Sequence, residues 1–88
     1  MKYHFVGICG VSMSALAVYL KNRGNIVQGS DIQLNTISKK LEDRGIRVFH
    51  GHHFQNVIDS DVVVNNFAID DDNEELAYAQ KQGIKIMS

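Results

Sequence analysis

Residues 3–17 read Tyr-His-Phe-Val-Gly-Ile-Cys-Gly-Val-Ser-Met-Ser-Ala-Leu-Ala, and this stretch decides the fold. A short run of aromatic and β-branched residues, about Tyr3 to Gly7, is typical of a buried strand. A turn of small residues follows, and after it apolar residues recur at the i, i+3, i+4, i+7 spacing of one helix face: Met13, Leu16, Ala17 and Leu20. We therefore predict a strand, a tight glycine-containing turn and an amphipathic helix.

The same order of elements returns along the chain. Three polar helical stretches each end at a glycine, Gly24, Gly45 or Gly83, and a short apolar run follows each of them. A glycine at that place can adopt the positive φ that closes a helix. A further strand, with three consecutive valines, is expected within Ser60–Asn65, because parallel strands are buried on both faces. The pattern predicts an α/β fold, a Rossmann-like open parallel five-stranded sheet of order 3-2-1-4-5 with helices on both faces.

Two further helices are predicted later in the chain. One runs from about Asn35 to Arg44, where Asn35 or Thr36 can cap the first turn. The other runs from about Asn73 to Gln82. Asp72 and Glu75 have the spacing of a capping box there, although an ordinary charged loop explains the acidic run equally well.

Composition restricts the class of protein. Eighty-eight residues with 44% hydrophobic and 22% charged side chains suit one small globular domain. A net charge of -1 argues against a general nucleic-acid or anionic-membrane surface, and no apolar run is long enough to span a bilayer. The single cysteine excludes an internal disulfide. We expect a cytoplasmic protein that partners neither nucleic acid nor membrane.

The turn after the first strand is the main candidate site. Free N–H groups at a helix start, beside small residues, bind phosphate, and we expect this from six residues: Gly7, Cys9, Gly10, Val11, Ser12 and Met13. Asp31, 24 residues after Gly7, is placed to bond ribose hydroxyls. A merely structural turn is the alternative. Cys9 could be a nucleophile, but a small filler is the favoured interpretation because no base is placed beside it.

Other candidates lie where strands end at the carboxyl edge of the sheet. His52 belongs to a histidine cluster, with His50 and His53, that could contact a ligand, hold a metal or simply face solvent. Asn66, Phe67 and Ala68 follow the valine strand, and Phe67 could stack on a base or fill the core. Ligands of open parallel sheets bind at this edge, where strand order reverses.

Four segments together resemble the N-terminal domain of the UDP-N-acetylmuramate:L-alanine ligases, within the Mur ligase family. Residues 4–15 look like the family's H-F-x-G-I-G-G-x-G-M-S-G, with Cys9, Ser12 and Ala15 in place of glycines. The family's G-S-D and G-H correspond to Gly29-Ser30-Asp31 and Gly51-His52. Its S-S-A-I-P-x-D-N-P-E corresponds to residues 66–75, with Asn66 and Phe67 in place of the serines and Asp70 and Glu74 in place of the prolines.

The resemblance implies that residues 1–88 are a single domain that binds the UDP part of UDP-N-acetylmuramate, without being catalytic alone. ATP, Mg²⁺ and L-alanine would be bound by central and C-terminal domains that this chain lacks, because no G-x-x-x-x-G-K-[ST] run occurs in it. The related ligase that recycles a tripeptide remains a possible identity. A regulatory NAD-binding module and a non-binding interaction domain are the alternatives from other classes.

Overall fold

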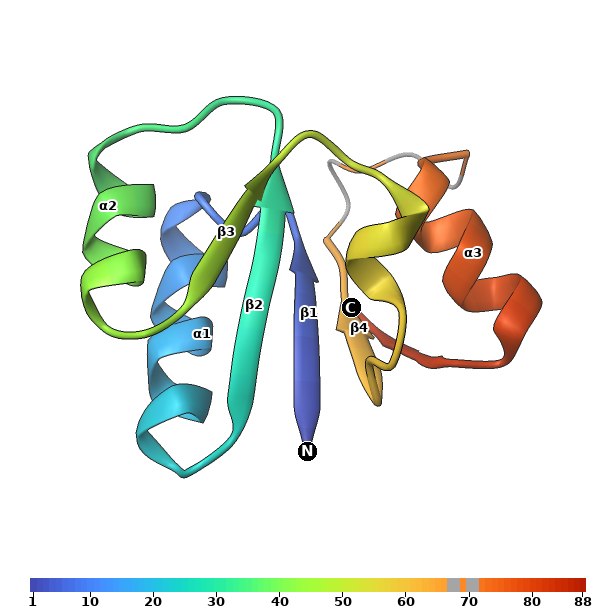
Figure 1. Cartoon of the computed structure of the whole chain (residues 1–88), viewed down its shortest axis with the longest axis horizontal. Helices are drawn as coiled ribbons and strands as arrows, with labels where there is room; N and C mark the ends of the chain where they lie inside the picture. The colour runs from blue at the N-terminus through green and yellow to red at the C-terminus, as the bar shows by residue number, and fades with distance from the viewer. Residues whose placement is uncertain (67–68, 70–71) are drawn as a thin grey trace.

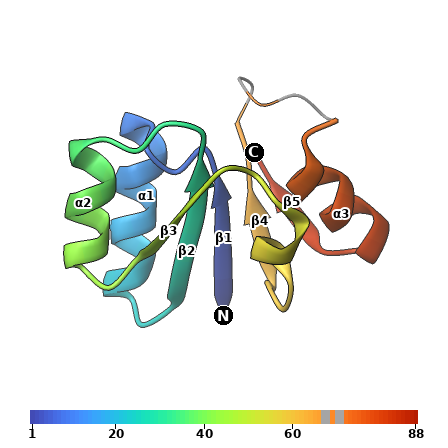
Figure 2. The same cartoon turned by 45° about the horizontal axis from the view of Figure 1, so that its top comes forward.

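The computed structural model describes residues 1–66, 69 and 72–88. Five parallel strands form one sheet in the order β3-β2-β1-β4-β5; Figure 1 labels the first four strands of the chain, and Figure 2 labels β5 beside β4. The fold and the strand order predicted from the sequence are thus confirmed. The strands in chain order are β1 (Lys2–Val6), β2 (Ile26–Asp31), β3 (Arg47–His50), β4 (Val62–Val64) and β5 (Lys85–Met87).

Helices cover both faces of the sheet, as predicted (Figure 2). On one face lie α1 (Val11–Asn22) and α2 (Thr36–Asp43), packed over a core that includes Phe5 and Leu41. The other face carries α3 (Glu74–Gln82) and a 3₁₀ helix, η1 (Phe54–Val57), which the sequence did not predict. Neighbouring residues of β1 therefore enter opposite cores, as the two-residue period of a strand requires.

Most local signals hold. The three helix-closing glycines have positive φ, at 90°, 82° and 72° for Gly24, Gly45 and Gly83. The valines of β4 are at most 2% exposed. Asn35, rather than Thr36, caps α2 through its side chain. On the predicted face of α1, Met13 and Ala17 are buried, Leu20 is partly buried against the same core, and Leu16 is 37% exposed.

The predicted capping box at the start of α3 is wrong. Asn73 is the N-cap, and its side-chain oxygen accepts from the N–H groups of Glu75 and Leu76. Asn73 lies one residue nearer the helix than Asp72 and offers the same kind of oxygen. The Glu75 side chain therefore does not return to the cap and turns into the protein. Asp70 and Asp71, of the acidic run, lie outside the described residues, as do Phe67 and Ala68.

Candidate ligand-binding site

A cleft of about 410 Å³ opens at the carboxyl edge of the sheet. It lies between the turn after β1, the end of β2 and the segments after β3 and β4. Six of the predicted site residues line it: Gly7, Cys9, Gly10, Asp31, His52 and Asn66. The other lining residues are Ile32, Gln33, Asn35 and Ile69. Val11, Ser12 and Met13 form the first turn of α1 beside it.

The turn after β1 is clamped onto β2. Gly7 has φ of +83°, and its N–H and that of Ile8 both donate to the Ser30 carbonyl, at 2.8 and 3.0 Å. Ile8 is fully buried and packs over Gly29, where an added Cβ would lie 2.6 Å from the Ile8 side chain. The glycine in β2 is thus what lets the loop approach the sheet closely.

The N-terminus of α1 is open. Its N-cap is Gly10, which has extended backbone and no side chain to bond the first turn. The N–H groups of Val11, Ser12 and Met13 have no carbonyl within the helix to reach, because the first turn precedes every acceptor. These N–H groups and the positive end of the helix dipole make this end of α1 suited to an anion.

The Asp31 side chain accepts hydrogen bonds from the backbone of two loops. One carboxylate oxygen accepts from the Cys9 N–H at 3.0 Å, and the other accepts from the Gln33 N–H at 3.3 Å. The Cys9 N–H is therefore already bonded within the protein, and the donors left for an anion begin at Val11. Asp31 also lines the cleft. Its hydrogen bond to ligand hydroxyls stays a prediction.

Cys9 is packed as a small apolar residue. Its side chain belongs to the core between α1, α2 and the sheet and is 7% exposed. Burial, followed by the nearby carboxylate of Asp31, raises the pKa of the Cys9 thiol. A raised pKa disfavours the thiolate, so the structure favours the filler interpretation over the nucleophile.

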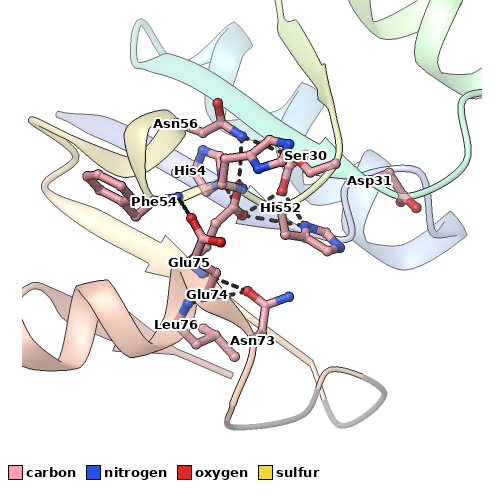
Figure 3. Close-up of polar contacts among 12 residues, drawn as sticks. His4, Ser30, Asp31, His52, Phe54, Asn56, Asn73, Glu74, Glu75 and Leu76 are labelled. Atoms are coloured by element: carbon pink, nitrogen blue, oxygen red, sulfur yellow. Dashed lines mark hydrogen bonds and ion pairs between the residues drawn. The ribbon is translucent and has the colours of Figure 1, made fainter.

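A buried carboxylate that the sequence did not point to stands behind the cleft. Glu75 is fully buried and accepts hydrogen bonds from His4 Nε2 at 2.8 Å, Ser30 Oγ at 2.5 Å and Asn56 Nδ2 at 2.9 Å (Figure 3). The backbone N–H of His53 donates to it as well, at 3.1 Å. Burial pushes the pKa of Glu75 up, but the bond from His4 and those from Ser30 and Asn56 outweigh it and hold the pKa below its ordinary value. Glu75 is thus an ionised carboxylate inside the protein.

The three histidines of the predicted cluster make separate contacts. His52 Nδ1 lies 2.7 Å from Ser30 Oγ and 3.6 Å from Glu75 Oε1. His50 Nε2 bonds the Ile32 carbonyl at 3.1 Å, and His53 contributes its backbone to the Glu75 cluster. Among residues 1–66, 69 and 72–88, no group of three or more histidine, cysteine or acidic side chains could hold a metal ion. Of the three, only His52 lines the cleft.

Comparison with known proteins supplies the family. The sequence model of the Mur ligase family, catalytic domain, matches residues 2–88. The chain belongs to the Mur ligase family. The UDP-N-acetylmuramate--L-alanine ligase of Acetivibrio thermocellus is 49% identical over 92% of this chain and 17% of that protein. The enzyme of the same name from Roseiflexus castenholzii is 45% identical over 99% of this chain and 18% of that protein.

Solved structures agree with this family. The UDP-N-acetylmuramate-alanine ligase of Thermotoga maritima superimposes with a TM-score of 0.95 at 39% identity, over 99% of this chain and 20% of that one. A murein peptide ligase from Psychrobacter arcticus gives 0.94 at 29% identity, over 100% and 19%. This Mur ligase chain therefore spans about a fifth of the length of the relatives it matches.

The glycine turn of this Mur ligase chain differs from the phosphate loop typical of ATP sites. Its 88 residues contain no G-x-x-x-x-G-K-[ST] run, and the glycine turn after β1 is followed by Val11 and Ser12 rather than by a lysine. In the part of the chain that the structure describes, no helix is long and apolar enough to cross a membrane.

The sequence did not reveal the buried cluster of Glu75, Ser30, His4 and Asn56 that lies next to the cleft of this Mur ligase chain. The sequence pattern predicts Glu75 as a capping residue and gives Ser30 only as the middle of the G-S-D motif. The available signal was a histidine in the middle of an otherwise apolar strand, because a buried imidazole needs polar partners.

Proposed function

We propose that this chain is the substrate-binding domain of an ATP-dependent Mur ligase that adds L-alanine to UDP-N-acetylmuramate, and that it binds the UDP end. The observation that carries the proposal is the open N-terminus of α1 beside the cleft at the carboxyl edge. It occurs in a chain 49% identical to a protein named UDP-N-acetylmuramate--L-alanine ligase. A diphosphate fits this place because the helix end supplies both N–H donors and a positive potential.

The binding residues of this proposal surround the cleft. The N–H groups of Val11, Ser12 and Met13 bind the diphosphate, and Gly7 and Gly10, which carry no Cβ, leave room for it. Asp31, His52 and Asn66 line the rest of the cleft, where they contact the sugar and base. Phe67 and Ala68 are included among the binding residues only because their segment resembles the corresponding motif of the family.

The remaining chemistry belongs, in this proposal, to other domains of a longer cytoplasmic enzyme. ATP, Mg²⁺ and L-alanine require residues that these 88 do not include. The role of this domain is then to hold the nucleotide end so that the distant carboxylate reaches the reaction centre. Binding energy from a non-reacting part of a substrate raises the rate in this way.

A tripeptide-adding ligase is the second candidate, because a murein peptide ligase matches the fold with a TM-score of 0.94. The identities favour the first candidate, at 49% and 45% for L-alanine ligases against 29% for the murein peptide ligase. Assay of the full-length enzyme with L-alanine and with the tripeptide decides between them.

Calorimetric titration of this chain tests the binding function. UDP-N-acetylmuramate and UDP are expected to bind, and NADH to bind more weakly or not at all. A ligand at 100 times its Kd should stabilise the domain by about 2.7 kcal/mol in thermal unfolding. Stabilisation by NADH and not by UDP would instead indicate a regulatory NAD-binding module.

A further inference from the structure

The hydrogen bonds around Glu75 form one chain whose direction can be assigned from its far end. The backbone carbonyl of Asn56 can only accept, so the side-chain atom of Gln28 that lies 2.5 Å from it is the amide nitrogen, Nε2. The same nitrogen lies 2.9 Å from His4 Nδ1, which must therefore accept. A neutral His4 then carries its proton on Nε2 and donates it to Glu75 Oε1 at 2.8 Å.

The direction continues from Glu75 to the cleft. Glu75 is ionised and only accepts, so the hydroxyl proton of Ser30 points to Oε1, at 2.5 Å. That hydroxyl has no second proton, and its 2.7 Å contact with His52 must use the proton on Nδ1. Whenever the His52 ring is neutral, Nε2 is consequently its bare nitrogen, on the side of the ring away from Glu75 (Figure 3).

We propose that Ser30 and Glu75 are positioning residues of the ligand cleft: together they hold His52 as the Nδ1–H tautomer and leave Nε2 to contact the bound sugar nucleotide. The inference rests on the proposed UDP-binding function for the identity of the ligand. In the neutral ring Nε2 is an acceptor, so its partner is a donor of the ligand, a hydroxyl or an N–H group. A carboxylate that fixes a histidine tautomer in this way is familiar behind metal ligands and catalytic histidines.

The first experiment needs no ligand. Nitrogen-15 NMR of the histidine-labelled chain, at a pH where the rings are neutral, reports which nitrogen of each ring carries the proton. We expect Nδ1–H for His52 and Nε2–H for His4. An Nε2–H tautomer at His52 would overturn the inference and leave the UDP-binding proposal untouched. With UDP bound at the same pH, the Nε2 resonance of His52 should shift as that nitrogen accepts a hydrogen bond, and an Nε2 resonance that bound UDP leaves unchanged would overturn the acceptor role.

The second experiment asks whether Ser30 acts through His52. We expect Ser30→Ala to weaken UDP binding about threefold to tenfold, the equivalent of one net hydrogen bond. The double variant with His52→Ala should bind no more weakly than His52→Ala alone. Additive losses would contradict the positioning role.

Ser60→Ala is the matched control. Ser60 is also a buried serine, but its Oγ has no hydrogen-bond partner among the described residues, and it does not line the cleft. We expect this variant to bind UDP as the parent does. Failure of the parent to bind UDP would refute the proposed function and with it the positioning role, while the NMR result would still decide the tautomer.

Discussion

Replacement of Glu75 by glutamine is expected to destabilise the fold, although the two side chains have nearly the same shape. The carboxylate accepts from His4, Ser30 and Asn56 and from the His53 N–H, at 2.8, 2.5, 2.9 and 3.1 Å. The amide keeps one oxygen and places an NH₂ group where the other oxygen was. Two of the four donors then face another donor inside the protein.

The partners cannot easily turn to relieve this conflict. Gln28 fixes the proton of His4, and Asn56 Nδ2 also donates to the Gly51 carbonyl at 3.2 Å. Each buried donor left without a partner costs about 1 to 3 kcal/mol, so the loss is about 2 to 6 kcal/mol. Since whole domains are stable by only about 5 to 15 kcal/mol, Glu75→Gln should remove a large share of the free energy of unfolding.

Urea unfolding followed by circular dichroism measures this loss, and Glu74→Gln is the control. Glu74 is the preceding residue of α3, is exposed and, among the described residues, accepts a hydrogen bond only from the Phe54 N–H, at 2.7 Å. A glutamine oxygen can still accept that bond, so the control should lose less than about 1 kcal/mol. The reasoning is refuted if both variants unfold with free energies within about 0.5 kcal/mol of each other.

Four further outcomes are expected. Because the pKa of Glu75 is lower in the folded than in the unfolded state, its ionised carboxylate stabilises the fold fully at pH values above its unfolded pKa, about 4.3. This stabilisation is lost as the pH falls through the folded pKa, so the urea midpoints of the parent and of Glu75→Gln should converge in acid. Ser12→Leu should abolish UDP binding in calorimetry by filling the space over the first turn of α1, whereas Ser12→Gly should preserve it. Asp31→Ala should weaken UDP binding by about 1 to 3 kcal/mol in the same assay, because the loop loses its bond at the Cys9 N–H. Gly29→Ala should lower the free energy of unfolding, measured in urea, by about 1 to 3 kcal/mol, because the new Cβ would lie 2.6 Å from the Ile8 side chain and 2.7 Å from the Phe5 carbonyl oxygen.

The fold could be predicted because its signals are local. Each strand is a short apolar run, and Gly24, Gly45 and Gly83 mark the helix ends directly in the sequence. The connection rules for parallel strands then leave few possible strand orders. The position of the glycine-containing turn could also be predicted from local sequence, because Gly7 and Gly10 stand between a strand and a helix.

Details that depend on competition between neighbours could not be predicted. Asp72 and Asn73 are both good N-caps, and only the backbone at the start of α3 shows that Asn73 takes the role. The 3₁₀ helix η1 is four residues long and has no repeat by which to recognise it. Asp31 was assigned to the ligand from its spacing, and its bond to the Cys9 N–H became visible only in three dimensions.

The Glu75 cluster is beyond sequence reasoning for a different reason. Its bonds join residues 71, 45 and 19 positions apart, and no periodic pattern connects them. An apolar cluster in the same place could stabilise the fold as well or better, because burying a charge requires its complete solvation by donors. An apolar cluster, however, does not determine which atom donates and which accepts in each contact. Here the donors on both arms of the chain converge on Glu75, from His4 on one side and from Ser30 and, behind it, His52 on the other, so the fully buried Glu75 links the packing of α3 to a side chain that lines the cleft.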